Sequence, residues 1–485
     1  MTTLTARDRK LFWFASALFL IVEAGIVYAE LYPAFLLPVA LFFLFLAFFR
    51  LDLFFFSMVF FVPLSVPLQE FMPDLPFNLS IPSELFILLI LFVMLYRYLR
   101  VRPPDRRLLF HPLTLAILAY LAWMLVTAVT STMPLVSFKF FVAHLWFIVA
   151  GYFLAWEIFL TGRRKMVIFL WAYMTGLFLI VLFTVFNQSM AGLVNQKAAH
   201  SAMKPFYNDH TSYGAMLALF IPVGVAFLSL KRKERLLPAW GVVLLTAVFL
   251  FGFIFSYSRA AWLSLVLAAG VALLVRLRIR FRTILLFAVI LGGLLFSFWT
   301  TIWLKLEENK QESSTSFAQH ISSMTNIRSD ASNLERINRW KCALKMYRER
   351  QLTGWGPGTY MFRYAPFQAS YDRTIISTDF GDMGTAHSEY LGPLSESGLP
   401  GLLTITAVFL LAFLTGVKVY RHATTAFDRA LALALITGLT SYFIHGMMNN
   451  FLERDKAAIP FWGFLAILVV MDITRENTEK KELPV

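Results

Sequence analysis

Apolar runs of roughly 18 to 20 residues recur along the chain from Leu11 to Asp472, and short polar segments separate them. A run of this length can cross the hydrocarbon core of a bilayer as a helix. The runs lack the alternation of apolar and polar residues that a membrane β-barrel requires. The pattern therefore predicts an all-α polytopic integral membrane protein with about 12–14 transmembrane helices.

We expect fourteen spans, of which the first three are the least distinct, so twelve spans remain the alternative. The expected spans are 11–30, 31–49, 53–68, 84–99, 113–132, 136–160, 166–186, 213–230, 237–257, 260–275, 283–303, 397–417, 430–447 and 457–472. In this scheme residues 1–303 hold the N-terminal transmembrane helices, and 304–386 form a large, partly helical loop. Residues 387–485 hold a histidine-containing segment and the C-terminal transmembrane helices.

Charge orients these spans. The net charge is +14, from 43 Lys and Arg against 29 Asp and Glu, and the basic residues concentrate in alternate connections. The basic clusters lie at 7–10, 50, 97–107, 163–165, 231–235, 276–282, 418–429 and from 475 onward. Basic connections favour the cytoplasmic side, so we expect both termini inside and the large loop outside. No basic face carries interleaved aromatic residues, which argues against nucleic-acid binding.

Cysteine content and the N-terminus add two expectations. Cys342 is the single cysteine, so no intramolecular disulfide can form, and no Cys/His spacing typical of a metal site occurs. The first span follows a short basic region, as in a signal peptide. No small-residue cleavage site follows it, so we expect this span to be retained.

The loop over 305–386 is too long to be a simple connection. Ser332 and Glu335 form a capping-box pattern, and an amphipathic helix is expected from there to near Arg350. Its apolar residues at helical spacing are Leu334, Ile337, Trp340, Leu344 and Tyr347. The sequence Gly354-Trp-Gly-Pro-Gly358 predicts a turn. A phosphate cradle is the alternative, but no Gly-Lys-Ser/Thr sequence follows it.

A polar segment, Ser256-Tyr-Ser-Arg-Ala-Ala-Trp262, interrupts two apolar runs and places Arg259 at the expected outer membrane face. Arginine keeps its charge, so a buried position requires an anion. A diphosphate would satisfy it, because a guanidinium binds phosphate oxygens as a fork. The alternative is a hairpin arginine whose side chain snorkels to the interface.

His387 closes the large loop in the sequence His387-Ser-Glu-Tyr-Leu-Gly-Pro-Leu-Ser-Glu396. An imidazole suits proton transfer near neutral pH, which makes His387 a candidate general base. The alternative is a structural histidine at the membrane interface. Glu396 follows nine residues later, too far along a helix to orient His387 directly, so we expect it to make a helix or loop hydrogen bond.

Further candidates lie in the other polar segments. Lys204, His200 and His210 share one outside loop, and Asp209 or Thr211 could cap the span that follows. Arg336 and Arg339 share a helix face and could touch a glycan or phosphate, although a solvated face is expected for Arg339. Ionisable residues within spans could form a polar pathway; they are Glu23, Lys139, His144, Glu157 and His445.

Taken in order, these motifs resemble the O-antigen ligase/polymerase family of bacterial envelope glycosyltransferases. Ser258-Arg-Ala-Ala-Trp-Leu263 is similar to the family's Ser-Arg-Ala-x-Trp-Leu. The segments 336–344 and 354–360 follow its arginine helix and glycine turn. His387 to Leu391 and Glu396 to Leu402 match its last two motifs, with Ser388 where the family usually has asparagine. The resemblance covers about 200–403 by motif.

The resemblance implies a GT-C-like fold in the bacterial inner membrane, with an active site facing the periplasm. It implies a glycan donor on polyprenyl (undecaprenyl) diphosphate, no metal and no cofactor. His387 would be the general base, and Arg259, Lys204 and Arg336 would bind the diphosphate. Possible supporting residues are His200, His210, Ser388 and Glu396.

Membrane lipid and two substrates are the implied partners. A ligase would transfer the glycan to a lipid A-core acceptor, whereas a polymerase would use a second lipid-linked glycan. Protein O-glycosylation is a further variant. A lipid-linked sugar transporter belongs to another class, and it would require paired intramembrane charges but not His387.

Overall fold

The computed structural model describes residues 13–30 apart from 15, 18, 20, 23, 26 and 29, and then 37–74, 79–100, 105–279, 331–370, 377 and 384–482. The chain divides into two compact units, Met1–Ser57 and Met58–Val485. The expected span 283–303, the loop up to residue 330, Glu23 and the side chain of Ser332 lie outside the described residues.

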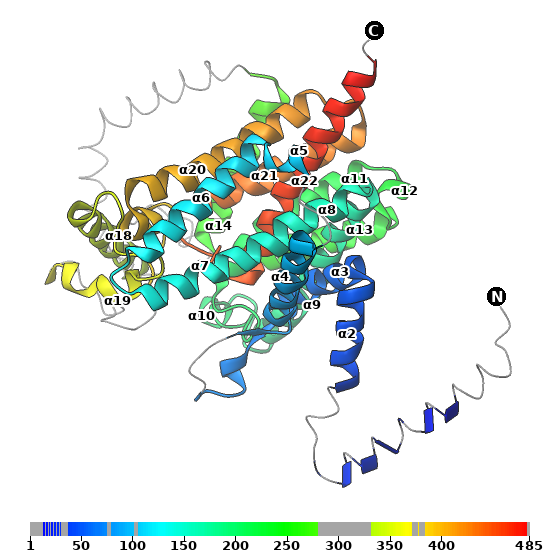
Figure 1. Ribbon diagram of the computed structural model, residues 1–485, viewed down its shortest axis with the longest axis horizontal. Helices are drawn as coiled ribbons and strands as arrows, with labels where there is room; N and C mark the ends of the chain where they lie inside the picture. Colours follow the sequence, from blue (N-terminus) through cyan, green and yellow to red (C-terminus); the bar gives the residue numbers. More distant parts are fainter. Residues whose placement is uncertain are drawn as a thin grey trace. The chain divides into compact units, whose positions relative to one another are not determined.

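Helices dominate the described chain (Figure 1). The helices up to residue 199 are α2 (Leu37–Phe49), α3 (Leu51–Leu64), α4 (Ser83–Arg100), α5 (Arg106–Leu109), α6 (Pro112–Val129), α7 (Pro134–Ile148), α8 (Ala155–Leu160), α9 (Arg163–Met190) and α10 (Gln196–Ala199). The later helices are α11 (His210–Ser229), α12 (Arg232–Arg235), α13 (Ala239–Phe255), α14 (Arg259–Arg276), α18 (Ala331–Glu349), α19 (Tyr360–Arg363), α20 (Leu391–Arg421), α21 (Ala426–His445) and α22 (Asp455–Glu482).

Short elements complete the described chain. A π-helical turn, Val149–Leu154, joins α7 to α8, and 3-10 turns cover Leu68–Glu70 and Ala365–Phe367. Strands β1 (Val66–Pro67) and β2 (Ser80–Ile81) pair antiparallel, with Val66 opposite Ile81.

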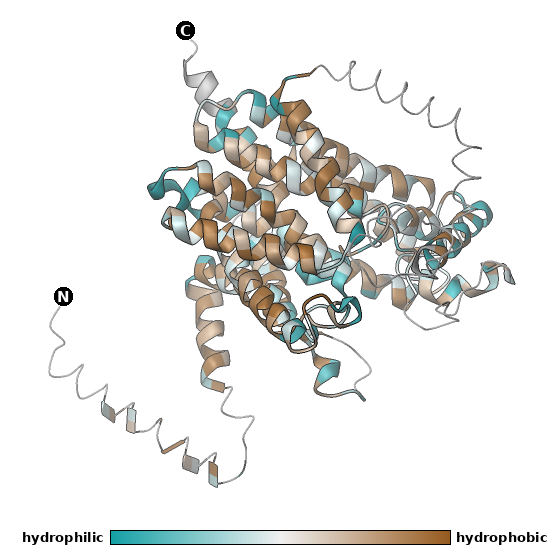
Figure 2. Cartoon of the chain, turned by 180° about the vertical axis from the view of Figure 1, so that it is seen from behind, coloured by the Kyte–Doolittle hydropathy of each residue, from teal (hydrophilic) through white to brown (hydrophobic). Residues whose placement is uncertain are grey.

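Eight described helical segments are long and apolar enough to cross a bilayer. They are Pro112–Val129, Pro134–Leu160, Arg163–Met190, His210–Ser229, Arg259–Arg276, Leu391–Arg421, Ala426–His445 and Asp455–Arg475. Three shorter apolar helices, α2, α3 and α13, overlap further expected spans. Figure 2 shows the apolar character of the long helices. The expected all-α, polytopic membrane protein is confirmed.

The final span, α22, lies at the centre of the second unit. Of its membrane-spanning residues, 94% are buried, against 22% for α14, so other helices rather than lipid surround α22. Helices α20 and α21 pack against each other, and α20 also packs against α6 (Figure 1). A side chain at Gly438 of α21 would come within 2.5 Å of the Leu219 carbonyl oxygen on α11. Glycine thus permits the close approach of two membrane helices.

The polar contacts join connections that the charge pattern assigns to the same side of the membrane. At one end, which we call the basic end, Arg97 bonds Glu157 at 3.0 Å and Arg163 bonds Asp428 at 2.6 Å. Asp472 also lies at this end and accepts hydrogen bonds from Lys418 and Arg475. At the other end, which we call the loop end, Thr385 bonds Asn450 and Lys456 bonds Ser65.

Helix α20 begins at Leu391, before the expected span at 397, and breaks at Gly398, where φ is 69° and ψ is −169°. A break leaves backbone groups without helical partners, which is costly within a membrane unless the protein supplies new ones. The large loop supplies most of them. Trp355 and Gly356 donate to the carbonyls of Ser395 (3.2 Å) and Glu396 (2.7 Å).

Two more bonds complete the repair of the break. The indole of Trp123 on α6 donates to the Ser397 carbonyl at 2.8 Å. Leu399 donates to the Gln351 carbonyl at 2.8 Å, just after the end of α18. The loop is thus fixed to the membrane helices by backbone hydrogen bonds.

The expected glycine turn is confirmed, and its glycines explain how the loop docks. Gly354, Gly356 and Gly358 all have positive φ, a region that favours glycine. A Cβ at Gly356 would overlap the hydroxyl of Ser131 between α6 and α7. The carbonyl of Trp355 accepts from the backbone and hydroxyl of Thr132, at 3.0 and 2.8 Å.

The expected amphipathic helix is confirmed as α18, and Leu334, Ile337, Trp340 and Tyr347 of its predicted apolar face are half-buried. The predictions for Leu344 and for the exposure of Arg339 are wrong. Leu344 is 42% exposed, and the helix buries instead Glu335, Asn338, Arg339, Cys342, Ala343 and Met346. Polar residues can be buried there because they are paired. Arg339 bonds Glu335 at 2.7 Å, and Asn338 bonds Gln368 at 2.9 Å.

Gly356→Ala should detach the loop turn from the membrane helices. The substitution combines a positive φ with overlap, so we expect a loss of at least about 2 kcal/mol. The measurement is the thermal unfolding midpoint in detergent, with limited proteolysis of the loop. Gly270→Ala, which has open space around it, is the control. Equal midpoints for the two variants would contradict the docking geometry.

Candidate functional site

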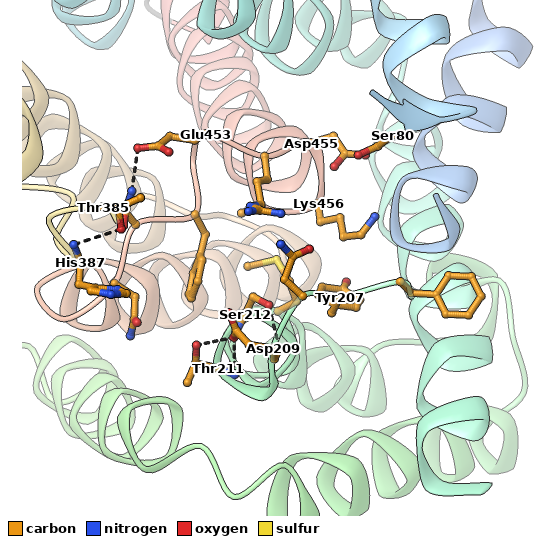
Figure 3. Close-up of a pocket in the computed structure, with 18 of the residues that line it drawn as sticks. Ser80, Tyr207, Asp209, Thr211, Ser212, Thr385, His387, Glu453, Asp455 and Lys456 are labelled. Carbon is orange, nitrogen blue, oxygen red and sulfur yellow. Dashed lines mark hydrogen bonds between the residues drawn. The ribbon is translucent and has the colours of Figure 1, made fainter. Parts of the chain in front are cut away.

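A cavity of about 400 Å³ opens among the loop-end connections. Its walls come from five separate stretches of sequence, all of which the charge pattern assigns to the same side of the membrane. They include Pro67 and Ser80, residues 206–209, 211 and 212 with Met216, Arg336, Thr385 with His387, and residues 449–457 apart from Leu452. Figure 3 shows His387, Asp209 and Lys456 on different sides of this pocket.

His387 sits in the cavity wall with a positive φ of 48°, which is unusual for a residue with a side chain. Its N–H donates to the Thr385 hydroxyl at 3.3 Å, and its carbonyl accepts from the Trp340 indole at 3.4 Å. Burial, followed by the charges of Arg339 and Arg336, lowers the pKa of His387 to about 3, against the opposing effect of Asp209. The imidazole is therefore neutral near pH 7 and able to accept a proton.

The charge of Arg336 acts on several of the candidate histidines. It lines the cavity with His387, and its charge also acts on the imidazoles of His210 and His445. Arg259 begins α14 and acts on His210 as well. His210 stacks on His200 with ring centroids 4.1 Å apart. The structure thus brings Arg259, Arg336 and His387 into one electrostatic neighbourhood.

Lys204 stands apart from these residues. Its side chain is exposed, and it is absent from the described residues that line the cavity, as are Arg259, His200 and His210. The neighbouring Phe206, Tyr207 and Asn208 do line it.

Asp209 caps α11, which is one of the two caps, Asp209 or Thr211, that the sequence predicted. Its Oδ1 accepts from the backbone of Thr211 and Ser212, both at 2.8 Å, and from the Thr211 hydroxyl at 2.5 Å. Burial alone would raise the pKa of Asp209, but these hydrogen bonds and His210 hold it below the ordinary value. The cavity that holds His387 is thus lined by three basic residues, Arg336, Arg454 and Lys456, and by three acidic ones, Asp209, Glu453 and Asp455.

Ser388 and Glu396 make contacts to the backbone. The Ser388 hydroxyl accepts from the backbone of Tyr390 and Leu391, at 3.2 and 3.3 Å, where α20 begins. Glu396 is buried and accepts from the Tyr360 backbone at 2.9 Å, just beyond the glycine turn. Both residues therefore fix the backbone on either side of the helix start.

The sequence analysis missed the turn between α21 and α22, which together with the first turn of α22 supplies eight of the cavity's lining residues. Lys456 is buried there and donates to the carbonyl and hydroxyl of Ser65 at 2.8 and 2.7 Å. Its ammonium also lies 5.7 Å from the ring centre of Tyr207. Four charged residues, Glu453 to Lys456, directly precede an apolar run, and this pattern could have revealed the turn.

The intramembrane candidates do not share one path. Lys139 is exposed, and Glu157 pairs with Arg97 at the basic end. His144 lines a second cavity of about 110 Å³ with Glu389 and Glu396, and His445 contacts Asn449 at 3.0 Å. In the part of the chain that the structure describes, no group of three or more His, Cys, Asp or Glu side chains could hold a metal ion.

The fold and site define a multi-pass membrane protein whose loop and helix ends enclose a polar cavity with a neutral histidine. Residues 244–406 match the family model described as O-Antigen ligase. The match covers about a third of the chain and spans Arg259, Arg336 and His387. By this match the chain is similar to membrane enzymes of the O-antigen ligase type. No curated protein matches the chain.

The two arginines of α18 should respond differently to substitution. Arg339→Met leaves Glu335 buried without its ion-pair partner, so we expect a loss of about 3–5 kcal/mol in stability. Arg336→Met, at a partly buried position in the cavity wall, should cost within about 1 kcal/mol. Thermal unfolding of both purified variants measures the contrast. A larger loss of stability for Arg336→Met than for Arg339→Met would contradict this division, in which Arg339 stabilises the loop and Arg336 lines the cavity.

Proposed function

We propose that this protein transfers a glycan from polyprenyl diphosphate to a sugar hydroxyl at the periplasmic face of the bacterial inner membrane. Ligation of O-antigen to lipid A-core is the reaction we favour. The observation that carries the proposal is the shared cavity of His387, Arg336 and Asp209, within a chain whose residues 244–406 match the O-antigen ligase family.

His387 acts as the general base in this proposal. Its neutral imidazole takes the proton of the acceptor hydroxyl while the hydroxyl oxygen attacks the anomeric carbon of the donor sugar. The bond from the anomeric carbon to the diphosphate oxygen breaks, and polyprenyl diphosphate leaves with the electron pair. The Asp209 carboxylate favours the imidazolium that forms, because its charge acts on His387 across the cavity.

Arg336 and Arg259 bind the donor diphosphate. A guanidinium offers two parallel N–H groups to phosphate oxygens and stabilises the charge that develops on the leaving group. Lys204 fits this role less well, because its side chain is exposed, whereas Arg259 is half-buried and its charge acts on His210. Beyond Arg259, α14 exposes Leu263 (47%), Val266 (69%) and Leu267 (47%). This apolar surface suits the polyprenyl chain of a donor whose diphosphate lies near Arg259.

The direct test compares His387→Ala with His422→Ala in a transfer assay with purified protein, lipid-linked glycan and acceptor. Loss of a general base should lower kcat by about 10²- to 10⁴-fold. His422 is exposed at the basic end, so its substitution should leave kcat unchanged. Full transfer by His387→Ala would contradict the base assignment.

The diphosphate role predicts a different kinetic change. Arg259→Ala should weaken use of the donor, which would appear as a lower kcat/KM for the lipid-linked glycan with a folded protein. One bond to a charged group is worth about 1.5–3 kcal/mol, which corresponds to a drop of about 10- to 150-fold. Unchanged turnover at limiting donor concentration would show that the diphosphate binds elsewhere.

The acceptor separates ligase from polymerase. A deletion strain that accumulates bare lipid A-core together with long lipid-linked glycan would support ligation. Accumulation of a carrier that holds a single repeat would instead identify a polymerase with the same donor site.

The pH dependence follows from the lowered pKa of His387. The neutral base form persists well below pH 6.5 in the free enzyme, so kcat/KM should stay flat from pH 7 to about 5. A bound diphosphate offsets the arginine charges and raises the pKa, so kcat should fall at a higher pH than kcat/KM does. Arg336→Ala should shift the acid limb of kcat/KM upward. Coincident limbs near pH 6.5 would contradict this account.

A further inference from the structure

Glu389 lies two residues after His387 and is only 7% exposed. One of its oxygens, Oε1, accepts three hydrogen bonds. The donors are the Tyr442 hydroxyl at 2.6 Å, the Phe451 N–H at 2.7 Å and the Leu452 N–H at 3.0 Å. All three donors come from the end of α21 and the α21–α22 turn, more than fifty residues away in sequence. This carboxylate therefore ties the segment that carries His387 to a distant turn.

The backbone reinforces the same connection. The Glu389 N–H donates to the Gly446 carbonyl at 2.7 Å, at the C-terminal end of α21. A Cβ at Gly446 would lie 3.0 Å from the Glu389 Cγ, so the two segments are in close contact. Burial raises the pKa of Glu389 to about 7 although its three donors oppose this. The carboxylate is thus held in a costly position, which its hydrogen bonds alone compensate.

The other side of His387 is tied to the same turn. The Thr385 hydroxyl accepts from the His387 N–H and donates to the Asn450 side chain at 2.8 Å. Asn450 in turn donates to Glu453 at 2.7 Å. His387, with its positive φ, is therefore held between two attachments, one through Thr385 and one through Glu389. Both attachments reach residues 446–453, of which Asn449, Asn450, Phe451 and Glu453 line the cavity.

We propose that Glu389 is a positioning residue, which holds His387 at the angle needed to reach the acceptor hydroxyl by fixing its backbone to the α21–α22 turn. The inference rests on the proposed role of His387 as general base. Glu389 itself touches neither substrate nor the reacting atoms, because its Oε1 points to the turn and its side chain lines the second, smaller cavity. Its effect on the reaction passes entirely through His387.

The test uses three variants of decreasing severity in the transfer assay. Glu389→Ala removes every acceptor oxygen, Tyr442→Phe removes one donor, and Glu389→Gln keeps an amide oxygen in the place of Oε1. A misplacement of about 1 Å can cost about 10²-fold in rate. We expect Glu389→Ala to lose about that factor in kcat while the donor KM stays within about 2-fold. The kcat of Tyr442→Phe should lie between those of Glu389→Ala and the unsubstituted protein, and Glu389→Gln should keep most of the unsubstituted kcat.

A double variant shows whether Glu389 acts through His387. In a His387→Ala background, Glu389→Ala should cause no further loss, because groups that act as a unit are not additive. Multiplied losses would overturn the proposal. Glu157→Gln, which alters a carboxylate at the basic end, is the control and should leave kcat unchanged.

The outcomes separate this inference from the proposed function. If His387→Ala transfers at full rate, the base assignment fails and the positioning role fails with it. If His387→Ala is inactive but Glu389→Ala and Tyr442→Phe keep full kcat, only the positioning role fails. If Glu389→Ala does not fold, the kcat values of Tyr442→Phe and Glu389→Gln test the positioning role instead. A full kcat in Tyr442→Phe then overturns the proposal.

Discussion

The whole site depends on the hydrogen bonds that the rest of the protein donates to the carbonyls at a break in a membrane helix. Helix α20 leaves its helical path at Gly398, and its carbonyls at Ser395, Glu396 and Ser397 then require new donors. Unsatisfied backbone groups at membrane depth cost several kcal/mol each. Two of the three donors come from the glycine turn at 354–358, so the large loop can satisfy the helix only by docking in one register. That register sets where α18, and with it Arg336, meets His387.

Docking also explains the electrostatics of the site. Burial of the loop against the helix ends removes water from His387 and brings Arg336 and Arg339 near it, which keeps its imidazole neutral. The two arginines have different roles, although they lie three residues apart. Arg339 forms a buried ion pair with Glu335 and bonds the Thr385 carbonyl at 3.1 Å, whereas Arg336 lines the cavity. The first stabilises the loop fold, and the second is the one to which the proposed function gives a role in binding substrate.

Local patterns in the sequence were enough to predict part of this site. The length of the apolar runs predicts the spans, the spacing of glycines predicts the turn at 354–358, and Asp209 before a polar–apolar boundary predicts a cap. The rest depends on contacts between distant residues. Periodicity alone placed Leu344 on the packed face of α18, but the helix buries Arg339 because Thr385 and Tyr364 meet it there. The sequence around Lys456 does not reveal that Ser65 is its partner, and the sequence around Glu389 does not reveal that Tyr442 is its partner.

The central claim is that donor diphosphate binds in the cavity beside a neutral, reactive His387. Diethyl pyrocarbonate modifies neutral imidazoles, so mass spectrometry of the labelled protein can follow each histidine separately. We predict that His387 is labelled at pH 6.5 and that saturating polyprenyl diphosphate protects it, while labelling of His422 at the basic end stays the same. Labelling of His387 that is unchanged by saturating polyprenyl diphosphate would contradict the account.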